Sequence, residues 1–108
     1  MQIPLAVKLA AVAAGDKKAS DIQTIDISAS SSFTDYFVLA TGLTKIHTRA
    51  VADFIEESLA EQDLVPLSRS GYQEGEWILL DYIDFIVHIF TPEARDYYQL
   101  ERLWEYRG

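Results

Sequence analysis

Residues 77–90 read Trp-Ile-Leu-Leu-Asp-Tyr-Ile-Asp-Phe-Ile-Val-His-Ile-Phe, and this segment is the most informative one about the fold. It contains two apolar runs, Trp77–Asp81 and Phe85–Phe90, separated by the three residues 82–84. This spacing predicts two antiparallel strands joined by a tight hairpin. Because apolar and polar residues barely alternate within either run, we expect apolar material on both faces of the sheet.

Two further strands are predicted upstream of this hairpin. Three isoleucines, Ile22, Ile25 and Ile27, mark the first strand, and residues 36–41 (Tyr-Phe-Val-Leu-Ala-Thr) form a stronger second one. The polar segment 28–35 between them reads as a turn. The two strands are therefore expected to lie antiparallel.

Three helices are predicted around these strands. Pro4 suits a first helical position and Gly15 stands where helices commonly end, which gives a first helix. Thr44 can cap a second helix that runs to about residue 62, and Thr91 before Pro92 can begin a third that reaches nearly to the C-terminus. Their expected apolar faces are Leu5, Leu9, Val12 and Ala13, then Ile46, Ala50, Val51, Phe54, Ile55 and Leu59, then Tyr97, Leu100, Leu103 and Trp104.

The predicted order is α-β-β-α-β-β-α. Segment 66–75, rich in glycine and polar residues, reads as a loop with room for a short edge strand. The helix at 44–62, which leads from the second strand to the third at 77–81, looks like a right-handed crossover. We therefore predict an α/β (α+β) fold, a single domain with a mixed β-sheet and helices packed on it.

Composition and charge narrow the classes of function. The 108 residues, 49% hydrophobic and 24% charged, are typical of one globular domain spanning residues 1–108. A net charge of -8 disfavours a nucleic-acid binder, because such proteins displace counterions from phosphates with Lys and Arg, and it favours a basic protein surface as partner. The absence of Cys excludes disulfides and thiolate sites. With neither a transit peptide nor a membrane span in the sequence, a bacterial cytoplasm is expected.

Metal and phosphate sites find little support. The two histidines are His47, at a predicted helix start, and His88, inside an apolar strand, and they form no ligand pair on one face. His88 reads as a histidine at the core edge, with backbone or carboxylate partners for its ring nitrogens. Thr41-Gly42 before a helix could hold an anion, but it lacks the glycine-rich nucleotide motifs. No metal or cofactor is expected.

Catalysis is also disfavoured, although one alternative stays open. Two-metal chemistry needs several carboxylates on one sheet face, and the position two residues after Asp35 is Phe37. The alternative is a residual nucleotide-binding or nucleotidyltransferase-like enzyme that uses Asp35, the Thr41-Gly42 turn and Asp84.

Aromatic residues are concentrated in the last third of the chain. Of the 13 aromatics, nine lie between Tyr72 and Tyr106. Because neighbouring helical residues point ~100° apart, at least one of Tyr97 and Tyr98 faces outward. Trp and Tyr dominate the hot spots of protein interfaces, so exposed rings here indicate a docking surface. A homodimer that hides this surface in the free protein is a second reading.

Several segments together resemble one known family. They are Lys17-Lys18 with Asp21-Ile22, then Ser32 with Asp35-Tyr-Phe-Val38 and Ala40-Thr-Gly42, then Gly75-x-Trp77 through Phe90, and Arg95-Asp-Tyr97-Tyr98-x-Leu100-Glu101-x-Leu103-Trp104. The chain is similar over about residues 5–105 to the ribosomal silencing factor family, also called Iojap. One departure is Ile83, where the family usually has Gly; since isoleucine does not comfortably adopt a positive φ, the turn is expected to differ in type.

The resemblance implies a non-enzymatic factor with a nucleotidyltransferase-like core that lacks the catalytic signature. It implies binding to the large ribosomal subunit through its protein fourteen, at the face where the small subunit docks, so that subunit association is blocked and translation repressed. By matching positions, the expected partner-binding residues are Trp77, Leu79, Asp81 and Tyr82 from the third strand and its turn, and Tyr97, Tyr98 and Leu100 from the final helix. In this reading Trp77 is the apolar anchor and Asp81 meets a Lys or Arg. For Leu79 and Leu100 ordinary core packing is the alternative, and Asp81 and Asp84 have a second reading as strand ends.

Overall fold

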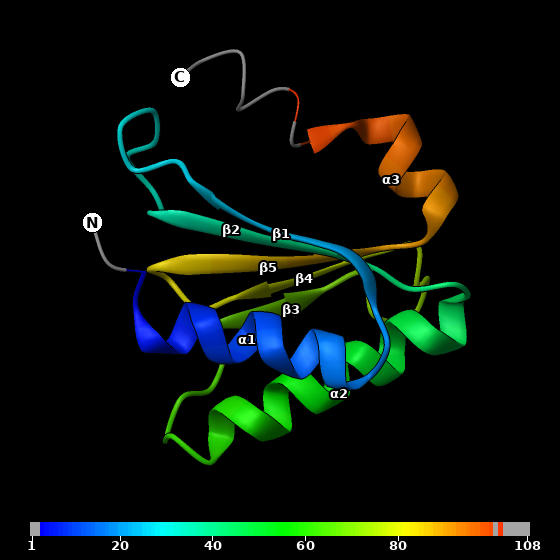
Figure 1. Cartoon of the computed structure of the whole chain (residues 1–108), viewed down its shortest axis with the longest axis horizontal. Coiled ribbons are helices and arrows are strands. Elements are labelled where there is room, and N and C mark those ends of the chain that lie inside the picture. Colours follow the sequence, from blue (N-terminus) through cyan, green and yellow to red (C-terminus); the bar gives the residue numbers. More distant parts are fainter. Residues whose placement is uncertain (1–2, 101, 103–108) are drawn as a thin grey trace.

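A five-stranded mixed sheet forms the centre of the molecule in the computed structural model, which describes residues 3–100 and 102. The elements are α1 (Leu5–Asp16), β1 (Ser20–Asp26), β2 (Tyr36–Thr41), α2 (Lys45–Ala60), β3 (Ser68–Ser70), β4 (Trp77–Asp81), β5 (Phe85–Phe90) and α3 (Pro92–Tyr98). The strand order is β1-β2-β5-β4-β3, with β2 and β5 parallel and the other neighbours antiparallel (Figure 1). The predicted mixed sheet with packed helices is confirmed.

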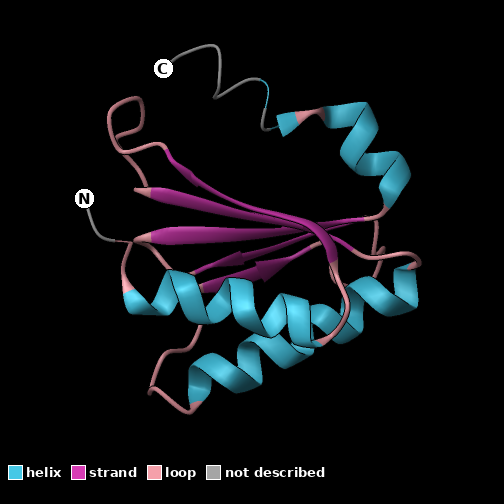
Figure 2. Ribbon diagram, viewed as in Figure 1, coloured by secondary structure: helices cyan, strands magenta, loops and turns pink. Residues whose placement is uncertain are grey.

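The helices lie on opposite sides of this sheet. Helices α1 and α2 cover one face, here called the inner face, whereas α3 lies on the other, the outer face, at the end of β5 (Figure 2). The inner face holds the larger core, in which Ile55 and Leu59 of α2 and Ile78 and Leu80 of β4 are fully buried. Removing any one of these side chains to alanine would cost about 2–5 kcal/mol.

The hairpin predicted from residues 77–90 is present. Strands β4 and β5 have the expected bounds and pair antiparallel, and every residue of β2 and β5 is buried, so apolar material does meet both faces of these strands. In contrast to β2 and β5, strand β4 alternates between buried and half-buried residues, because its inner face is covered and its outer face is partly open to solvent. Segment 66–75 was predicted to be a loop that could include a short edge strand, and β3 is that strand.

The crossover differs from the expectation. The neighbour of β2 that runs parallel to it is β5, whereas β4, the strand to which the helix was expected to lead, runs antiparallel to β5. The strand that directly follows α2 in the chain is the edge strand β3. Helix α2 therefore leads to the far edge of the sheet, and the hairpin brings the chain back beside β2. Both β2 and β5 are buried along their whole length, and the central positions of the sheet are the ones that bury both faces of a strand.

The predicted apolar stripe of the first helix is only half correct, since Ala13 is buried and Leu9 packs against the core but the other two residues do not. The bounds of α1 agree, but Leu5 and Val12 are exposed, and the buried residues are Val7, Ala10, Ala13 and Ala14. These small side chains allow α1 to pack closely against α2 and the sheet. In α2, Thr44 caps as expected, accepting a hydrogen bond from the His47 amide, but Ile46 is exposed.

The end of the last helix and the turn at Ile83 both differ from the expectation. Helix α3 ends at Tyr98, because Gln99 adopts a left-handed conformation with φ 47°, so the predicted continuous last helix is wrong; Leu103 and Trp104 lie outside the described residues. Ile83 does adopt a positive φ, 76°. The Asp84 amide donates to the Tyr82 carbonyl and the Ile83 amide to Asp81 Oδ1, and these two bonds hold the strained turn.

Candidate functional site

Trp77 is the centre of an aromatic cluster at the α3 end of the outer face. Its ring stacks on Phe90, with 5.1 Å between ring centroids, and lies 4.7 Å from the Tyr98 ring. The indole is half-buried, since β4 presents it outward while α3 covers it from one side. Strand pairing places Trp77 directly beside Phe90, which fixes the ring where β5 turns into α3.

His88 of β5 contacts the Trp77 indole and extends this cluster toward β2. Trp77 Nε1 donates a hydrogen bond of 3.0 Å to His88 Nδ1, and the imidazole edge meets the Phe37 ring. The expected backbone or carboxylate partner of His88 is therefore replaced by an indole, and Nε2 has no hydrogen-bond partner among the described residues. Burial of the ring, which is 3% exposed, lowers the pKa of His88 to about 3. The histidine stays neutral and accepts the indole N–H.

A pocket of about 480 Å³ opens beside Trp77. It is lined by Gly71, Glu74, Glu76, Trp77, Glu93, Ala94, Tyr97 and Tyr98, and we call it the acidic aromatic pocket. Three carboxylates and three aromatic rings share its wall, and Tyr97 and Tyr98 are 80% and 52% exposed. Aromatic faces and carboxylates both attract cations, so the pocket is chemically suited to a Lys or Arg side chain.

The loop between β3 and β4 forms one wall of the pocket and is tied to α2. Arg49 donates to two carbonyls of this loop, from Nε to Tyr72 over 3.0 Å and from Nη2 to Gln73 over 2.7 Å. Thr48 Oγ1 donates to the Gly75 carbonyl over 2.6 Å. These bonds satisfy carbonyls that the turn leaves free and thereby fix the two loop glutamates of the pocket.

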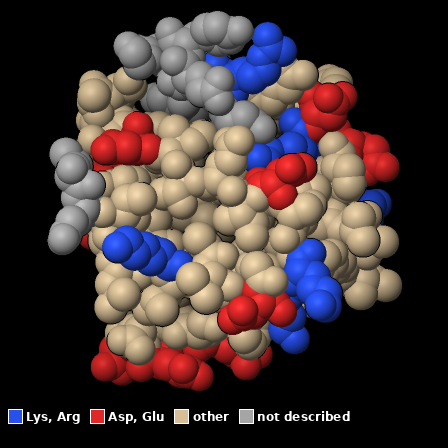
Figure 3. All heavy atoms as spheres, viewed as in Figure 1, with Lys and Arg blue, Asp and Glu red and all other residues tan. Residues whose placement is uncertain are grey.

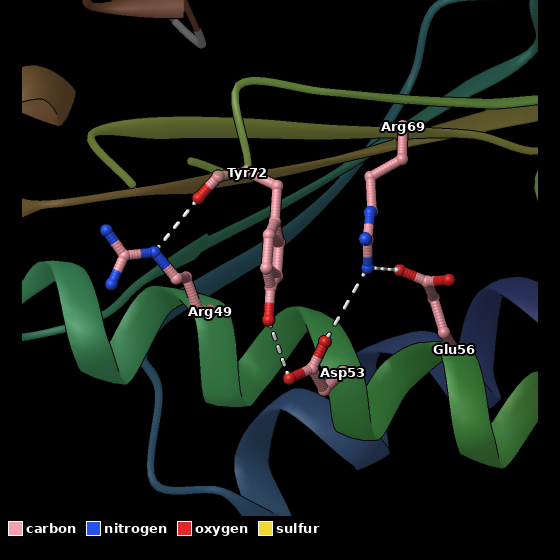
Figure 4. Close-up of polar contacts among 5 residues, drawn as sticks. All are labelled: Arg49, Asp53, Glu56, Arg69 and Tyr72. Carbon is pink, nitrogen blue, oxygen red and sulfur yellow. Dashed lines mark hydrogen bonds and ion pairs between the residues drawn. The ribbon is translucent and has the colours of Figure 1, made fainter. Parts of the chain in front are cut away.

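The side chain of Tyr72 provides a second set of contacts between the loop and α2. Its hydroxyl donates to Asp53 Oδ2 over 2.9 Å, and Arg69 of β3 lies 4.0 Å over its ring (Figure 4). The same guanidinium pairs with Glu56 at 3.0 Å and Asp53 at 3.6 Å. The hydrogen bond to Asp53 raises the pKa of Tyr72. Each contact is partly exposed and contributes little alone, but together they hold the Tyr72 ring in one place.

The structure brings most of the sequence-predicted residues to one side of the molecule. Trp77, Leu79 and Asp81 all point to the outer face, because they alternate along β4. Tyr97 and Tyr98 line the acidic aromatic pocket, and Leu100 packs against the outer core. Asp81 stands at the opposite end of β4 from Trp77 and accepts from the Ile83 amide, in agreement with its alternative reading as a strand end.

Tyr82 is the exception among the predicted partner-binding residues. It is only 8% exposed, belongs to the inner core and stacks on Phe85 with 4.9 Å between ring centroids. Tyr82 therefore does not share the outer face with Trp77, because the turn after Asp81 directs the ring to the face covered by α1 and α2. A position in a turn does not reveal which side of a sheet a ring will reach.

Glu74, Glu76 and Glu93 were not predicted from the sequence. They come from a loop and from the start of α3, and the Thr91 amide, which precedes α3, donates to the Glu76 carbonyl and joins the two segments. The available signal was the acidic flank of Trp77, Gly71 to Glu76, facing a helix that starts with an acid. Acidic and basic groups are interspersed over the face seen in Figure 3. Because this face carries no extended region of one charge, a cation is attracted by local groups of carboxylates.

The residues of the enzymatic alternative are not brought together. Asp35 and Asp84 adjoin at the start of β2 and β5, since the Asp35 amide donates to the Asp84 carbonyl. Thr41 and Gly42 lie at the opposite end of β2, where Arg95 donates to Thr41 Oγ1 over 2.8 Å. Among the described residues, no three His, Asp or Glu side chains converge as a metal site. None of the helices in this part of the chain has the length and hydrophobicity of a membrane span.

Comparisons with known proteins agree with this geometry. Residues 1–107 match the family model described as "Ribosomal silencing factor during starvation". The ribosomal silencing factor of Bacillus subtilis is 36% identical over 98 residues, covering 91% of this chain and 83% of the relative. A crystal structure of a protein from Chromobacterium violaceum superposes with a TM-score of 0.92 at 35% identity, covering 97% of this chain and 88% of that one. A more distant mouse relative, 28% identical over 95 residues (85% of this chain, 42% of the relative), is named "Mitochondrial assembly of ribosomal large subunit protein 1". The chain belongs to the ribosomal silencing factor family, whose members are regulatory factors of the ribosome rather than enzymes.

Proposed function

We propose that this protein silences ribosomes by binding protein fourteen of the large subunit, and that its bulk then keeps the small subunit from joining. The observation that carries the proposal is the acidic aromatic pocket beside Trp77. It is the described cavity that combines exposed rings with several carboxylates, and such a site selects a cationic side chain. Proteins that contact ribosomal RNA are rich in Lys and Arg, because these residues neutralise phosphates.

The family supports the same partner class. Relatives carry ribosomal silencing in their names, and the mouse relative's name refers to the ribosomal large subunit. The resemblance noted in the sequence implies protein fourteen specifically. A bacterial ribosome lies in the cytoplasm, which is where we place this protein.

The docking surface that we propose extends from the pocket along the outer face. Tyr97 and Tyr98 are its exposed rings, Trp77 is the half-buried anchor, and Leu79 and Asp81 continue it along β4. A standard interface needs only about 800 Å² from each partner. The solvent-accessible surface of this chain is 6399 Å², so such a contact would occupy a modest share of it. The rest of the domain would then obstruct the approach of the small subunit. The proposed mechanism is steric and uses no bond-making step.

Charge assists the approach to the partner. A net charge of -8 attracts a basic protein surface over a distance of about 8 Å at physiological ionic strength. We expect rising salt to slow association more than it accelerates dissociation.

Binding to purified large subunits tests the proposal. Tyr97→Ala removes an exposed ring from the pocket and Glu93→Gln removes a carboxylate, and neither touches the inner core. We expect each to weaken binding by at least about tenfold, as hot-spot truncations of ~1.4 kcal/mol or more do, and to restore subunit joining in a sucrose gradient. The control is Glu57→Gln on the exposed face of α2, which removes the same charge far from the pocket.

Unchanged affinity of both pocket variants would reject the pocket as the docking site. Tight binding to the large subunit without any effect on joining would reject steric exclusion while keeping the docking site. A mass that doubles with concentration and is lost in Tyr97→Ala would instead place a second copy of the chain on the pocket. Trp77→Ala is less decisive, because this ring also packs on Phe90 and bonds to His88.

A further inference from the structure

A second cavity lies at the end of the sheet opposite to Trp77. It measures about 280 Å³ and is lined by Pro4, Ala6, Val7, Asp35, Tyr36, Leu64, Tyr82, Asp84 and Phe85; we call it the Tyr82 cavity. This volume is near the lower limit of small-ligand sites, which begin at about 300 Å³. Its buried residues, Val7, Tyr36, Tyr82 and Phe85, form the interior, while the exposed Asp35 and Asp84 mark its opening.

Tyr82 brings an unused hydrogen-bond donor to this cavity. The residue is 8% exposed, and its hydroxyl has no partner among the residues that the structure describes. Burial raises the pKa of Tyr82 to about 12, so the hydroxyl keeps its proton and remains a donor. A buried polar group without a partner is destabilising, and such groups are uncommon unless a ligand or water completes them. The Tyr82 ring stacks on Phe85, which also lines the cavity, with ring planes 9° apart.

The two carboxylates give the opening a negative charge. The Asp35 amide donates to the Asp84 carbonyl over 3.0 Å, which keeps the two residues side by side, and no Lys or Arg is among the residues that line the cavity. The N-terminus of α1, at Pro4, opposes this field, but a helix end carries only about half of one positive charge. Two carboxylates outweigh it, so the opening favours a cation.

We propose that the Tyr82 cavity binds a small amphipathic amine, with an apolar body among Val7, Tyr36 and Phe85, an oxygen that accepts from the Tyr82 hydroxyl, and an ammonium group at Asp35 and Asp84. The three parts of the cavity set these three requirements independently. The site lies at the other end of the sheet from the acidic aromatic pocket and does not depend on the function proposed above.

Tyramine is the probe, because it joins a phenol oxygen to an ammonium group through one ring. Titration is followed by the amide resonances of Val7, Tyr36 and Phe85 in the full chain. We expect saturable shifts with a dissociation constant in the range of about 1–10 mM, which is typical for a ligand of this size. Two matched probes dissect the contacts, since 2-phenylethylamine lacks the phenol oxygen and 4-ethylphenol lacks the ammonium group. Both are expected to bind more weakly than tyramine.

Variants locate the contacts. Asp84→Asn should weaken tyramine about fivefold or more and leave 4-ethylphenol unchanged, because one close charge pair near a surface is lost. Tyr82→Phe should remove the advantage of tyramine over 2-phenylethylamine, and it should not lower the melting temperature, since it deletes an unpaired hydroxyl. The control is Tyr97→Phe, a phenol at the other end of the sheet. No saturable shift at these amides, or equal binding of all three probes, would overturn the proposal.

Discussion

The indole N–H of Trp77 donates to Nδ1 of His88 across the β4–β5 pair, at 3.0 Å. The two residues belong to neighbouring strands but are not directly paired, since Leu79 is the residue opposite His88. The bond therefore runs diagonally over the outer face and sets the orientation of the ring on which Tyr98 rests. A protonated imidazole could not accept this bond.

The first prediction concerns acid stability. Burial holds the pKa of His88 at about 3, below its usual 6.5, so between these values the unfolded chain binds a proton that the folded chain does not. This contribution is complete above pH 6.5 and is lost as the pH falls toward 3, by up to about 1.4 kcal/mol per pH unit. Chemical denaturation at several pH values measures it.

The matched variant is His88→Gln, whose amide oxygen can still accept from Trp77 but does not titrate. We expect the difference in unfolding free energy between the native chain and this variant to shrink as the pH falls below 6.5. Parallel curves for the native chain and His88→Gln would show that the imidazole titrates normally.

A second prediction concerns the turn at Ile83. This β-branched residue has φ 76°, a conformation that costs about 1–3 kcal/mol, and its side chain is 58% exposed. Ile83→Gly should therefore raise the unfolding free energy by about 1 kcal/mol, after the greater flexibility of glycine in the unfolded chain is subtracted. Ile83→Ala is the control and should not stabilise, because alanine meets the same strain. A glycine variant less stable than the native chain would contradict the assignment of strain.

Glycine substitutions test the loop that lines the acidic aromatic pocket. A Cβ at Gly75 would lie 2.9 Å from Lys45 Cβ and 3.2 Å from its carbonyl oxygen, at φ +75°. Gly75→Ala should cost about 2 kcal/mol or more. Gly15→Ala is the matched change, since its Cβ would meet Ile22 at an ordinary 3.7 Å within α1, and it should stabilise by about 0.5–1 kcal/mol. Equal thermal denaturation of the two variants would contradict this account.

The last prediction tests the tie between Arg49 and the loop. Arg49→Gln removes the two hydrogen bonds to the carbonyls of Tyr72 and Gln73, so amide exchange in residues 71–76 should accelerate about tenfold. Affinity for the large subunit should fall with it, because the loop glutamates lose their fixed position. Lys8→Gln removes the same charge from the exposed face of α1 and should change neither. Native exchange in Arg49→Gln would show that other contacts hold the loop.

Much of the fold followed from local pattern. The apolar runs at 77–81 and 85–90 matched β4 and β5, and Thr44 and Thr91 capped α2 and α3. These features depend on residues within a few positions of one another, where strand propensity and capping chemistry act directly. The buried face of α1 escaped this reasoning, because alanines that permit close packing and leucines that face solvent differ only in what lies opposite them.

Residue pattern alone was enough to predict most of the helices and strands, the family and the concentration of aromatic rings in the last third of the chain. Three features emerged only in the folded chain: β5, and not β4, pairs with β2, Tyr82 turns inward, and the three glutamates of the acidic aromatic pocket lie beside Trp77. The physical reason is the large separation along the chain of the residues that make these contacts. Each of these outcomes depends on contacts between segments far apart in the chain, whose free energies are summed over the whole core and leave no trace in any short stretch of residues.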